Sequence, residues 1–346
     1  MVTLLLFILI LGLIVFIHEF GHFIFAKKHG VYVHEFSLGF GPKLFSFRRK
    51  NDETEYMIKA IPLGGYVMLA GETEEEPDGK KVPKNTKLTD KGFFQKLSIM
   101  VAGVFNNFLL GIFLLFIIGL IYGSSFSGNT LSNLNKDYPL YKAGARNNDK
   151  IVLINNKKIK TFDDIETAIA IAGEGKTLNI TVEKPNKKQA KYKVKPTYDK
   201  KSKSYFYGIS IKTEYKKDFI SAIKYSFTKF ISIYKSLIIV IISLFKGELG
   251  LSSLSGPVGI YQVVGVAKSS LYMILYLTAY LSINVGFMNL LPFPAFDGGR
   301  AFLLILEKIF RKKLPSKIED IINTVGFVLL MILMVFVTIK DIFKLF

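Results

Sequence analysis

The sequence predicts a polytopic α-helical membrane protein with four transmembrane helices, a membrane-associated β-hairpin on the cytoplasmic side and one small extracytoplasmic α+β domain. Three observations support this fold class. Half of the 346 residues are hydrophobic, and the mean hydropathy is +0.34. Four stretches are long and apolar enough to cross a bilayer, which takes about 20 residues in a helix. The polar segments between them contain patterns typical of β-strands.

The four predicted transmembrane helices cover residues 2–26, 97–122, 271–291 and 321–339. No Lys or Arg precedes the first of them, whereas Lys27 and Lys28 follow it at once, so we do not interpret it as a cleavable signal peptide. Because short loops rich in Lys and Arg stay in the cytoplasm, the N-terminus is expected outside. Five basic residues mark a second cytoplasmic segment, 292–320, after the third helix: Arg300, Arg311, Lys312, Lys313 and Lys317. The tail 340–346 is then expected outside.

Residues 219–245 form a fifth apolar stretch that we interpret differently. Three lysines interrupt it, and its uninterrupted apolar run, 237–245, is too short to cross a bilayer alone. An amphipathic helix at the membrane interface, within residues 216–268, fits this pattern better. A fifth crossing would also separate the segment after the third span from His22, and the site considered below requires both on the same side.

Charge and cysteine content narrow the possible functions. The net charge is +19, and no nucleic-acid-binding pattern accompanies it, so the basic excess fits contact with anionic membrane lipids. The chain has no cysteine, which excludes disulfides, thiolate zinc sites and cysteine catalysis. Any metal ion must therefore be held by His, Asp or Glu side chains.

His18, Glu19 and His22 form a His-Glu-x-x-His pattern inside the first predicted span. Residues four apart share one face of a helix, so His18 and His22 can bind one Zn²⁺ while Glu19 reaches a bound water as general base. The pattern occurs by chance in soluble helices, and polar helix packing is an alternative. Two histidines and a glutamate in hydrocarbon are costly, however, unless they are paired, bind a metal or face water. This placement predicts a functional site.

A zinc site of this type needs a third ligand, and nearby residues do not supply it. The metzincin pattern would continue with Gly at position 25 and His at position 28, where the chain has Phe25 and Lys28. Asp297 is the better candidate. Prolines at 292 and 294 break the helix before it, and the glycines at 298 and 299 allow a tight reversal beside it. The alternative is that Asp297 only caps a helix over residues 299–310.

The pentapeptide at residues 18–22 and the run Asn-Leu-Leu-Pro-Phe-Pro-Ala-Phe-Asp-Gly-Gly at residues 289–299 together resemble the bacterial site-2 proteases. These intramembrane zinc metalloproteases cleave anti-sigma factors and signal-peptide remnants in regulated intramembrane proteolysis. The resemblance implies that zinc is held by His18, His22 and Asp297 and that Glu19 activates the water. It also implies that Asn289 helps hold the extended substrate backbone. Pro292 and Pro294, which leave backbone carbonyls free, and Gly39 and Gly41, which permit close backbone approach, are further candidate substrate-binding residues.

The likeness extends over nearly the whole chain, because residues 100–107 and 255–260 also look similar to the family. One departure is Val104, where the family usually has proline, so a kink in the second span is in doubt. The resemblance implies a multi-pass protein of the bacterial inner membrane. Its expected partners are single-span membrane proteins, membrane lipids and a site-1-type protease that cuts first.

A polar module, residues 126–213, is predicted between the second and third spans. Its strands are expected at residues 150–155, 178–183 and 192–196, with a helix at 162–172. Residues 143–156 resemble the turns of a PDZ domain, with Asn148 and Asn156 in place of glycines. Asn tolerates left-handed backbone better than most residues, so the turns are expected to survive. A PDZ groove accepts a peptide as an added strand, which suggests gating of substrates, and a simple spacer is the alternative.

The cytoplasmic segment 27–96 is predicted to contain a β-hairpin, with strands at residues 36–48 and 55–69 and a turn at 51–54. The family carries a membrane-reentrant β-hairpin here, and this stretch looks similar. A substrate helix must unwind before it can be cut, and an exposed strand edge would pair with the backbone groups that unwinding frees. An ordinary cytoplasmic hairpin is the alternative. Residues 72–91 are expected to be a solvated mobile loop.

Together these features predict an intramembrane zinc endopeptidase that cleaves single-span membrane proteins. One alternative is a catalytically silent membrane scaffold that binds extracytoplasmic tails through the PDZ module. A zinc or proton transporter is disfavoured because the spans show no internal repeat.

Overall fold

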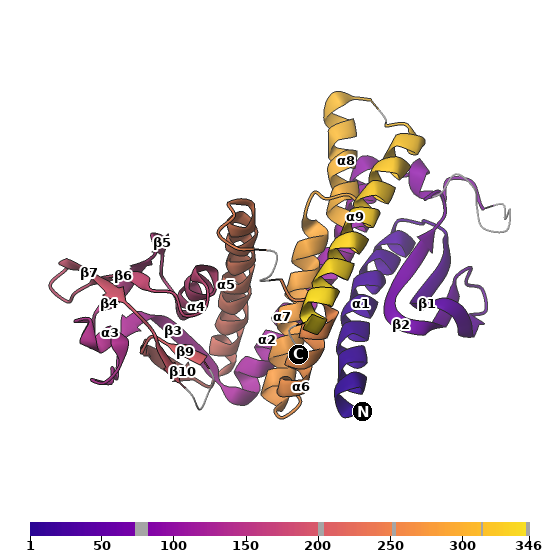
Figure 1. Ribbon diagram of the computed structural model, residues 1–346. Helices are drawn as coiled ribbons and strands as arrows, with labels where there is room; N and C mark the ends of the chain where they lie inside the picture. The colour runs from indigo at the N-terminus through magenta and orange to yellow at the C-terminus, as the bar shows by residue number, and fades with distance from the viewer. Residues whose placement is uncertain (73–81, 200–203, 251–253, 313, 344–346) are drawn as a thin grey trace. The chain divides into compact units, whose positions relative to one another are not determined.

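The computed structural model describes residues 1–346 except 73–81, 200–203, 251–253, 313 and 344–346 (Figure 1). The chain divides into two compact units. Residues 1–114 and 255–346 form the first unit, and residues 115–254 form the second. Each unit has its own sheet and its own core.

The first unit is built mainly from long apolar helices. Its helices are α1 (Val2–Lys28), most of α2 (Phe93–Tyr122), α6 (Pro257–Ala267), α7 (Leu271–Leu290), α8 (Asp297–Phe310) and α9 (Ser316–Phe343). Four of these helices, α1, α2, α7 and α9, are long and apolar enough to cross a membrane, and so is α5 (Phe219–Phe245) of the second unit. The prediction of a multi-pass helical membrane protein with additional β-sheets is confirmed at this level.

Helices α1 and α2 cross closely because glycines lie at the crossing. A methyl group on Gly21 would lie 2.5 Å from the carbonyl oxygen of Ala102, so only glycine permits this approach. Helix α2 continues unbroken through the buried Val104. Toward its N-terminus, α1 packs against α6 and α7 through Ile14 and its neighbours.

The sheet of the first unit consists of two long antiparallel strands, β1 (Val33–Arg48) and β2 (Glu55–Leu69). Residues 35–38 lie opposite two segments of β2, residues 65–68 on one side and 55–58 on the other, because both strands bend. Asn51, with φ of 65°, turns the chain between them. The predicted hairpin is therefore present, and its strands fold back on each other.

The predicted loop after the hairpin is only partly described. Residues 73–81 lie outside the described residues, so the expected mobility is not addressed there. The following segment contains a short 3-10 helix, η2 (Leu88–Asp90). Leu88 is buried in a small core with Leu69 and Ile99, and its N–H donates to the carbonyl of Ala70 at 2.7 Å. This end of the segment is packed rather than solvated.

The second unit contains the predicted α+β module. Its strands are β3 (Ser124–Leu131), β4 (Lys150–Ile154), β5 (Lys157–Lys158), β6 (Leu178–Glu183), β7 (Gln189–Val194), β8 (Thr197–Asp199), β9 (Ser204–Phe206) and β10 (Ile211–Lys216), and its helices are α3 (Pro139–Lys142), α4 (Phe162–Ala172) and α5. The main sheet has the order β10-β3-β4-β6-β7, with β5 paired to β4. Asn148 and Asn156 have φ of 70° and 67°, so both adopt the left-handed backbone expected of them.

Helix α5 presents two different faces. Its polar side contacts the module, where Lys229 pairs with Asp163 of α4 and the Thr167 hydroxyl donates to Ser236 Oγ at 2.9 Å. The other side leaves a row of large apolar side chains exposed at helical spacing: Ile220, Ile223, Phe227, Ile231, Ile238, Ile242 and Phe245. The helix is thus amphipathic, with the module on one side and an apolar stripe on the other.

Candidate active site

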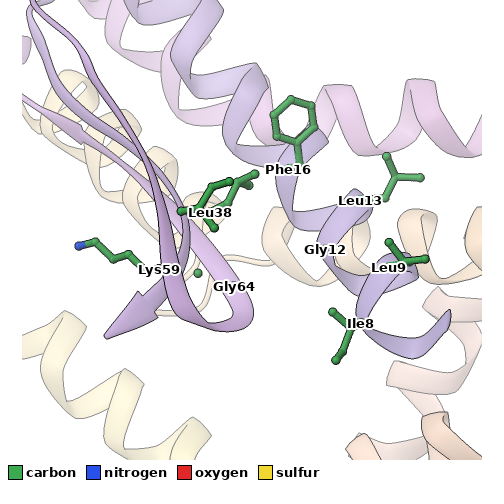
Figure 2. Close-up of a pocket in the computed structure, with 10 residues that line it drawn as sticks. Ile8, Leu9, Gly12, Leu13, Phe16, Leu38, Lys59 and Gly64 are labelled. Atoms are coloured by element: carbon green, nitrogen blue, oxygen red, sulfur yellow. The ribbon is translucent and has the colours of Figure 1, made fainter. Parts of the chain in front are cut away.

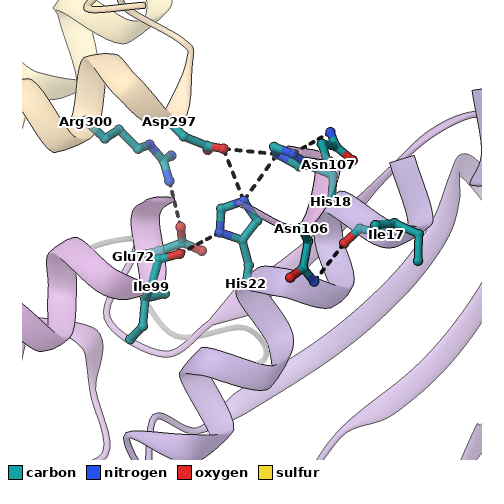
Figure 3. Close-up of polar contacts among 9 residues, drawn as sticks. All are labelled: Ile17, His18, His22, Glu72, Ile99, Asn106, Asn107, Asp297 and Arg300. Atoms are coloured by element: carbon teal, nitrogen blue, oxygen red, sulfur yellow. Dashed lines mark hydrogen bonds and ion pairs between the residues drawn. The ribbon is translucent and has the colours of Figure 1, made fainter. Parts of the chain in front are cut away.

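Three side chains meet between α1 and the start of α8. His18 and His22 lie one turn apart on α1, and their Nε2 atoms are 3.2 Å from each other (Figure 3). Asp297 Oδ2 lies 3.0 Å from His18 Nε2 and 3.2 Å from His22 Nε2. The structure therefore brings the three predicted ligands together across almost the full length of the sequence.

The hydrogen bonds around this cluster leave lone pairs that face one another, an arrangement that favours a metal ion. His22 Nδ1–H donates to the carbonyl of Ile99 at 2.8 Å, which leaves a lone pair on Nε2. Asp297 Oδ2 is buried and has no hydrogen-bond partner. Acceptor atoms that face each other without protons repel unless a cation lies between them. The ligand atoms of His18, His22 and Asp297 lie within 4.8 Å of one another, and this donor set fits zinc.

Helix α2 orients His18 as well. Its Nδ1 lies 3.2 Å from Asn107 Nδ2, while Asn107 Oδ1 is buried without a partner. If the amide turns over, Oδ1 accepts from the Nδ1–H of His18, and the lone pair of His18 Nε2 then faces the metal position. Asn106, the preceding residue, donates to the carbonyl of Ile17 at 3.2 Å. Two adjacent amides thus fix the ligand-bearing turn of α1.

Gly103 of α2 lies directly against both histidines. A methyl group there would lie 2.4 Å from His22 Nε2 and 2.7 Å from His18 Cε1. The closest approach of α1 and α2 is therefore also the place where the ligands converge. Only glycine at position 103 leaves space for the two imidazole rings that face the metal position.

Asp297 is the first residue of α8, and its side chain does not cap that helix. The N-cap is Phe296, which makes no side-chain cap hydrogen bond. The capping alternative considered for Asp297 therefore does not describe its position. Methyl groups on Gly298 and Gly299 would lie 2.3 and 2.2 Å from the carbonyl oxygens of Leu290 and Phe293. These two glycines let the first turn of α8 fold tightly onto the preceding loop.

Helix α9 supports that loop from the other side. The prolines end α7 as predicted, and the loop then turns at Ala295, with φ of 73°. The Ala295 N–H donates to Asn323 Oδ1 at 3.3 Å. A methyl group on Gly326 would lie 2.4 Å from Pro294 Cβ. The loop that carries Asp297 therefore rests on the last helix.

Glu19 lies beside strand β2. A methyl group on Gly65 would lie 3.3 Å from Glu19 Cγ and 2.8 Å from the carbonyl oxygen of Ser37. The absence of a side chain at Gly65 lets the strand lie close to the Glu19 side chain. The sheet thus passes directly against the residue predicted to be the general base.

The predicted substrate-binding residues occupy different environments. Asn289 is half-buried in the last turn of α7, Pro292 is exposed, and Pro294 packs against α9. Gly39 lines an apolar cavity of about 490 Å³ between α1 and the sheet (Figure 2), whereas Gly41 contacts the Ile61 side chain outside it. The cavity residues come from both elements: Ile8, Leu9, Gly12, Leu13, Phe16, Leu38, Gly39, Ile58, Lys59 and Gly64.

Several residues at the site had no predicted role. Asn107 and Gly103 belong to the segment 100–107, which looked similar to the family but carried no function. A ligating histidine usually donates its second ring N–H to a nearby acceptor, so the two predicted ligands already implied that such acceptors exist. Which α2 residue would accept could not be known before the helix crossing was placed. Asn323 and Gly326 gave no sequence signal.

Comparison with known proteins agrees with this geometry. The sequence matches the model of peptidase family M50 over residues 6–333. A protein from Clostridium perfringens is 37% identical over 331 residues, covering 95% of each chain. One from Fusobacterium nucleatum is 35% identical over 354 residues, covering 99% of each chain. One from Staphylococcus aureus is 31% identical over 434 aligned positions, covering 100% of this chain and 99% of its own. All three carry the name "Putative zinc metalloprotease".

Proposed function

Because this chain belongs to peptidase family M50 and is a zinc metalloprotease, we propose that it is an intramembrane endopeptidase that cleaves single-span membrane proteins. The observation that carries the proposal is the meeting of His18, His22 and Asp297 on an apolar helix of membrane-spanning length. A buried ligand set of this kind is of no use to a soluble substrate that never enters the bilayer. The complete ligand set also disfavours a catalytically silent scaffold.

In this proposal His18, His22 and Asp297 hold zinc, and Glu19 acts as the general base and then the general acid. Zinc, when bound, lowers the pKa of a water ligand to about 7 and polarises a carbonyl group. Glu19 accepts a proton from the attacking water and gives it to the leaving nitrogen of the cleaved peptide bond. Asn107 and the Ile99 carbonyl keep both imidazoles turned with Nε2 inward.

The apolar cavity beside α1 is the proposed entry for the substrate. It is lined by residues 8–16 of α1, which precede the ligand-bearing turn, and by the bent sheet. An unwound substrate segment loses its intrahelical hydrogen bonds, and a neighbouring strand edge can replace them. The substrate classes that fit are anti-sigma factors and signal-peptide remnants, shortened beforehand by a site-1-type protease. Asn289, Pro292, Pro294 and Gly39 are the proposed contacts.

We further propose that α1, α2, α7 and α9 cross the membrane and that α5 does not. The polar contacts of α5 with α4 support this arrangement, because a crossing α5 would carry Asp163 and Thr167 of the module to membrane depth. The exposed apolar stripe of α5 then rests on the outer membrane surface. The module acts as an extracytoplasmic PDZ domain that limits which substrates reach the cavity.

The decisive test compares wild type with Glu19→Gln. Purified Glu19→Gln protein should keep its zinc and lose cleavage of a single-span substrate by at least 10²- to 10⁴-fold, because the general base is gone. Membranes from cells carrying the variant should accumulate single-span fragments, which proteomics would identify. Near-normal turnover by the zinc-loaded variant would refute the assignment.

A further inference from the structure

An ion pair connects the sheet directly to the helix that carries Asp297. Glu72 follows β2 by three residues, and its Oε1 accepts from Arg300 Nη1 of α8 at 2.7 Å (Figure 3). Its other oxygen, Oε2, accepts from the N–H of Leu69 at 3.2 Å. One carboxylate therefore closes the turn after β2 and reaches α8 at the same time.

Both ends of this contact are fixed to elements of the site. On the sheet side, Leu69 is buried, and the next residue, Ala70, donates its N–H to the carbonyl of Tyr32 at 2.9 Å. On the helix side, Arg300 lies three residues after Asp297 in the same turn of α8. That turn is packed so closely on the preceding loop that Asp297 and Arg300 must move together.

The same strand also touches the proposed general base. Gly65 of β2 lies against Glu19, seven residues before Glu72. The strand thus contacts one part of the reaction centre at Gly65 and is tied to another part through Glu72 and Arg300. A shift of β2 relative to α8 would move the strand edge that is proposed to pair with the substrate, and it would move that edge relative to Asp297.

We propose that Glu72 and Arg300 are positioning residues that hold the substrate-presenting strand at a fixed distance from the metal ligand Asp297. This inference rests on the proposed function, because the strand matters only if it presents substrate. The pair touches neither the substrate nor the reacting atoms. Its contribution is expected to be modest, since both side chains are partly exposed to solvent.

The test compares two single variants with a charge exchange in the full-length protein, using a single-span substrate. Glu72→Gln and Arg300→Gln should each lower kcat about five- to tenfold with KM and zinc content little changed, the range expected for a coupling of this kind. The exchange Glu72→Arg with Arg300→Glu should recover most of the loss. Glu55→Gln is the matched control, because it breaks the ion pair of Glu55 with Lys43 in the same sheet, 2.8 Å, away from α8.

Three outcomes would overturn the positioning role. They are unchanged kcat in both single variants, no recovery of kcat in the exchanged protein, and loss of zinc together with activity. Proximity is checked without activity by Glu72→Cys with Arg300→Cys, which a bismaleimide should link in this otherwise cysteine-free chain. If the double-cysteine variant cross-links while zinc-loaded wild type cleaves nothing, the proposed function would be refuted and the contact itself would stand.

Discussion

The two sides of the metal site are held in different ways. His18 and His22 lie in the middle of an unbroken helix that α2 braces through Gly103 and two adjacent asparagines. Asp297 lies where a helix begins, on a short loop that rests on α9. On the helical side, the atoms closest to Gly103 belong to the two histidine rings themselves. On the loop side, the atoms closest to Gly326 belong to Pro294, three residues before Asp297, so equal disturbances should have unequal effects on the ligands.

The largest effect is expected on the helical side, from Gly103→Ala. The added methyl group would overlap His22 Nε2 at 2.4 Å, so the helices must separate or the ligands must turn away. Zinc content, measured by atomic absorption, should fall to near zero, and cleavage with it. Gly12→Ala is the control for zinc content, because nothing lies within 4 Å of a methyl group there. Retention of zinc by Gly103→Ala would show that the crossing is looser than described.

Asn107→Ala tests the orientation of His18 without adding bulk. Loss of an outer-shell partner of a metal-bound histidine typically weakens metal affinity 10- to 100-fold. Competition with a chromogenic chelator should show a drop in this range, and Asn107→Asp should restore part of it because a carboxylate also accepts from Nδ1–H. An unchanged affinity in Asn107→Ala would mean that helix packing alone orients His18.

Gly326→Ala tests the loop side with the same methyl group used on the helical side. The contact with Pro294 Cβ would be as short as the one at Gly103, 2.4 Å, but Pro294 lies three residues before Asp297 and is not itself a ligand. Activity should fall about three- to tenfold with most of the zinc retained, since a displaced ligand weakens positioning before it abolishes binding. A complete loss of zinc would contradict the difference between the two sides.

A smaller effect is expected far from the site, in the turn of the hairpin. Burial alone would raise the pKa of Asp52. Hydrogen bonds from the Lys27 ammonium at 2.7 Å, the Thr54 N–H and the Tyr56 hydroxyl outweigh this and hold the pKa of Asp52 below its usual value. A carboxylate with a lowered folded-state pKa stabilises the fold above its unfolded pKa, near 4, and loses this contribution as pH falls further.

Asp52→Asn should therefore destabilise the protein by about 1–2 kcal/mol at pH 7, as expected for hydrogen bonds to a charged group. The difference from wild type should shrink between pH 5 and pH 3. Thermal unfolding in detergent, followed by circular dichroism, measures both values. A difference that stays constant over this pH range would show that charge on Asp52 is not the cause.

The difference between the two sides of the metal site also shows which site residues could be predicted from the sequence. The two histidines were predictable because their spacing of four matches the helical period, and Asp297 was predictable through the resemblance of its loop. The long helices, and three of the eight described strands of the second unit, followed from periodicity and strand-forming residues. Asn107, Gly103 and Gly326 were not predictable, because their roles depend on which faces of separate helices meet. Spacing along one helix is local, whereas a helix crossing is not.

The dependence of the Asp297 loop on α9 has a consequence for biogenesis. The ribosome completes the His18–His22 turn early, but Gly326 follows about 300 residues later. At 5–20 residues per second, this interval is roughly 15 to 60 s. During that time the chain lacks Asn323 and Gly326, which support the loop of Asp297. The arrangement of His18, His22 and Asp297 can therefore form only when synthesis of the chain is nearly finished.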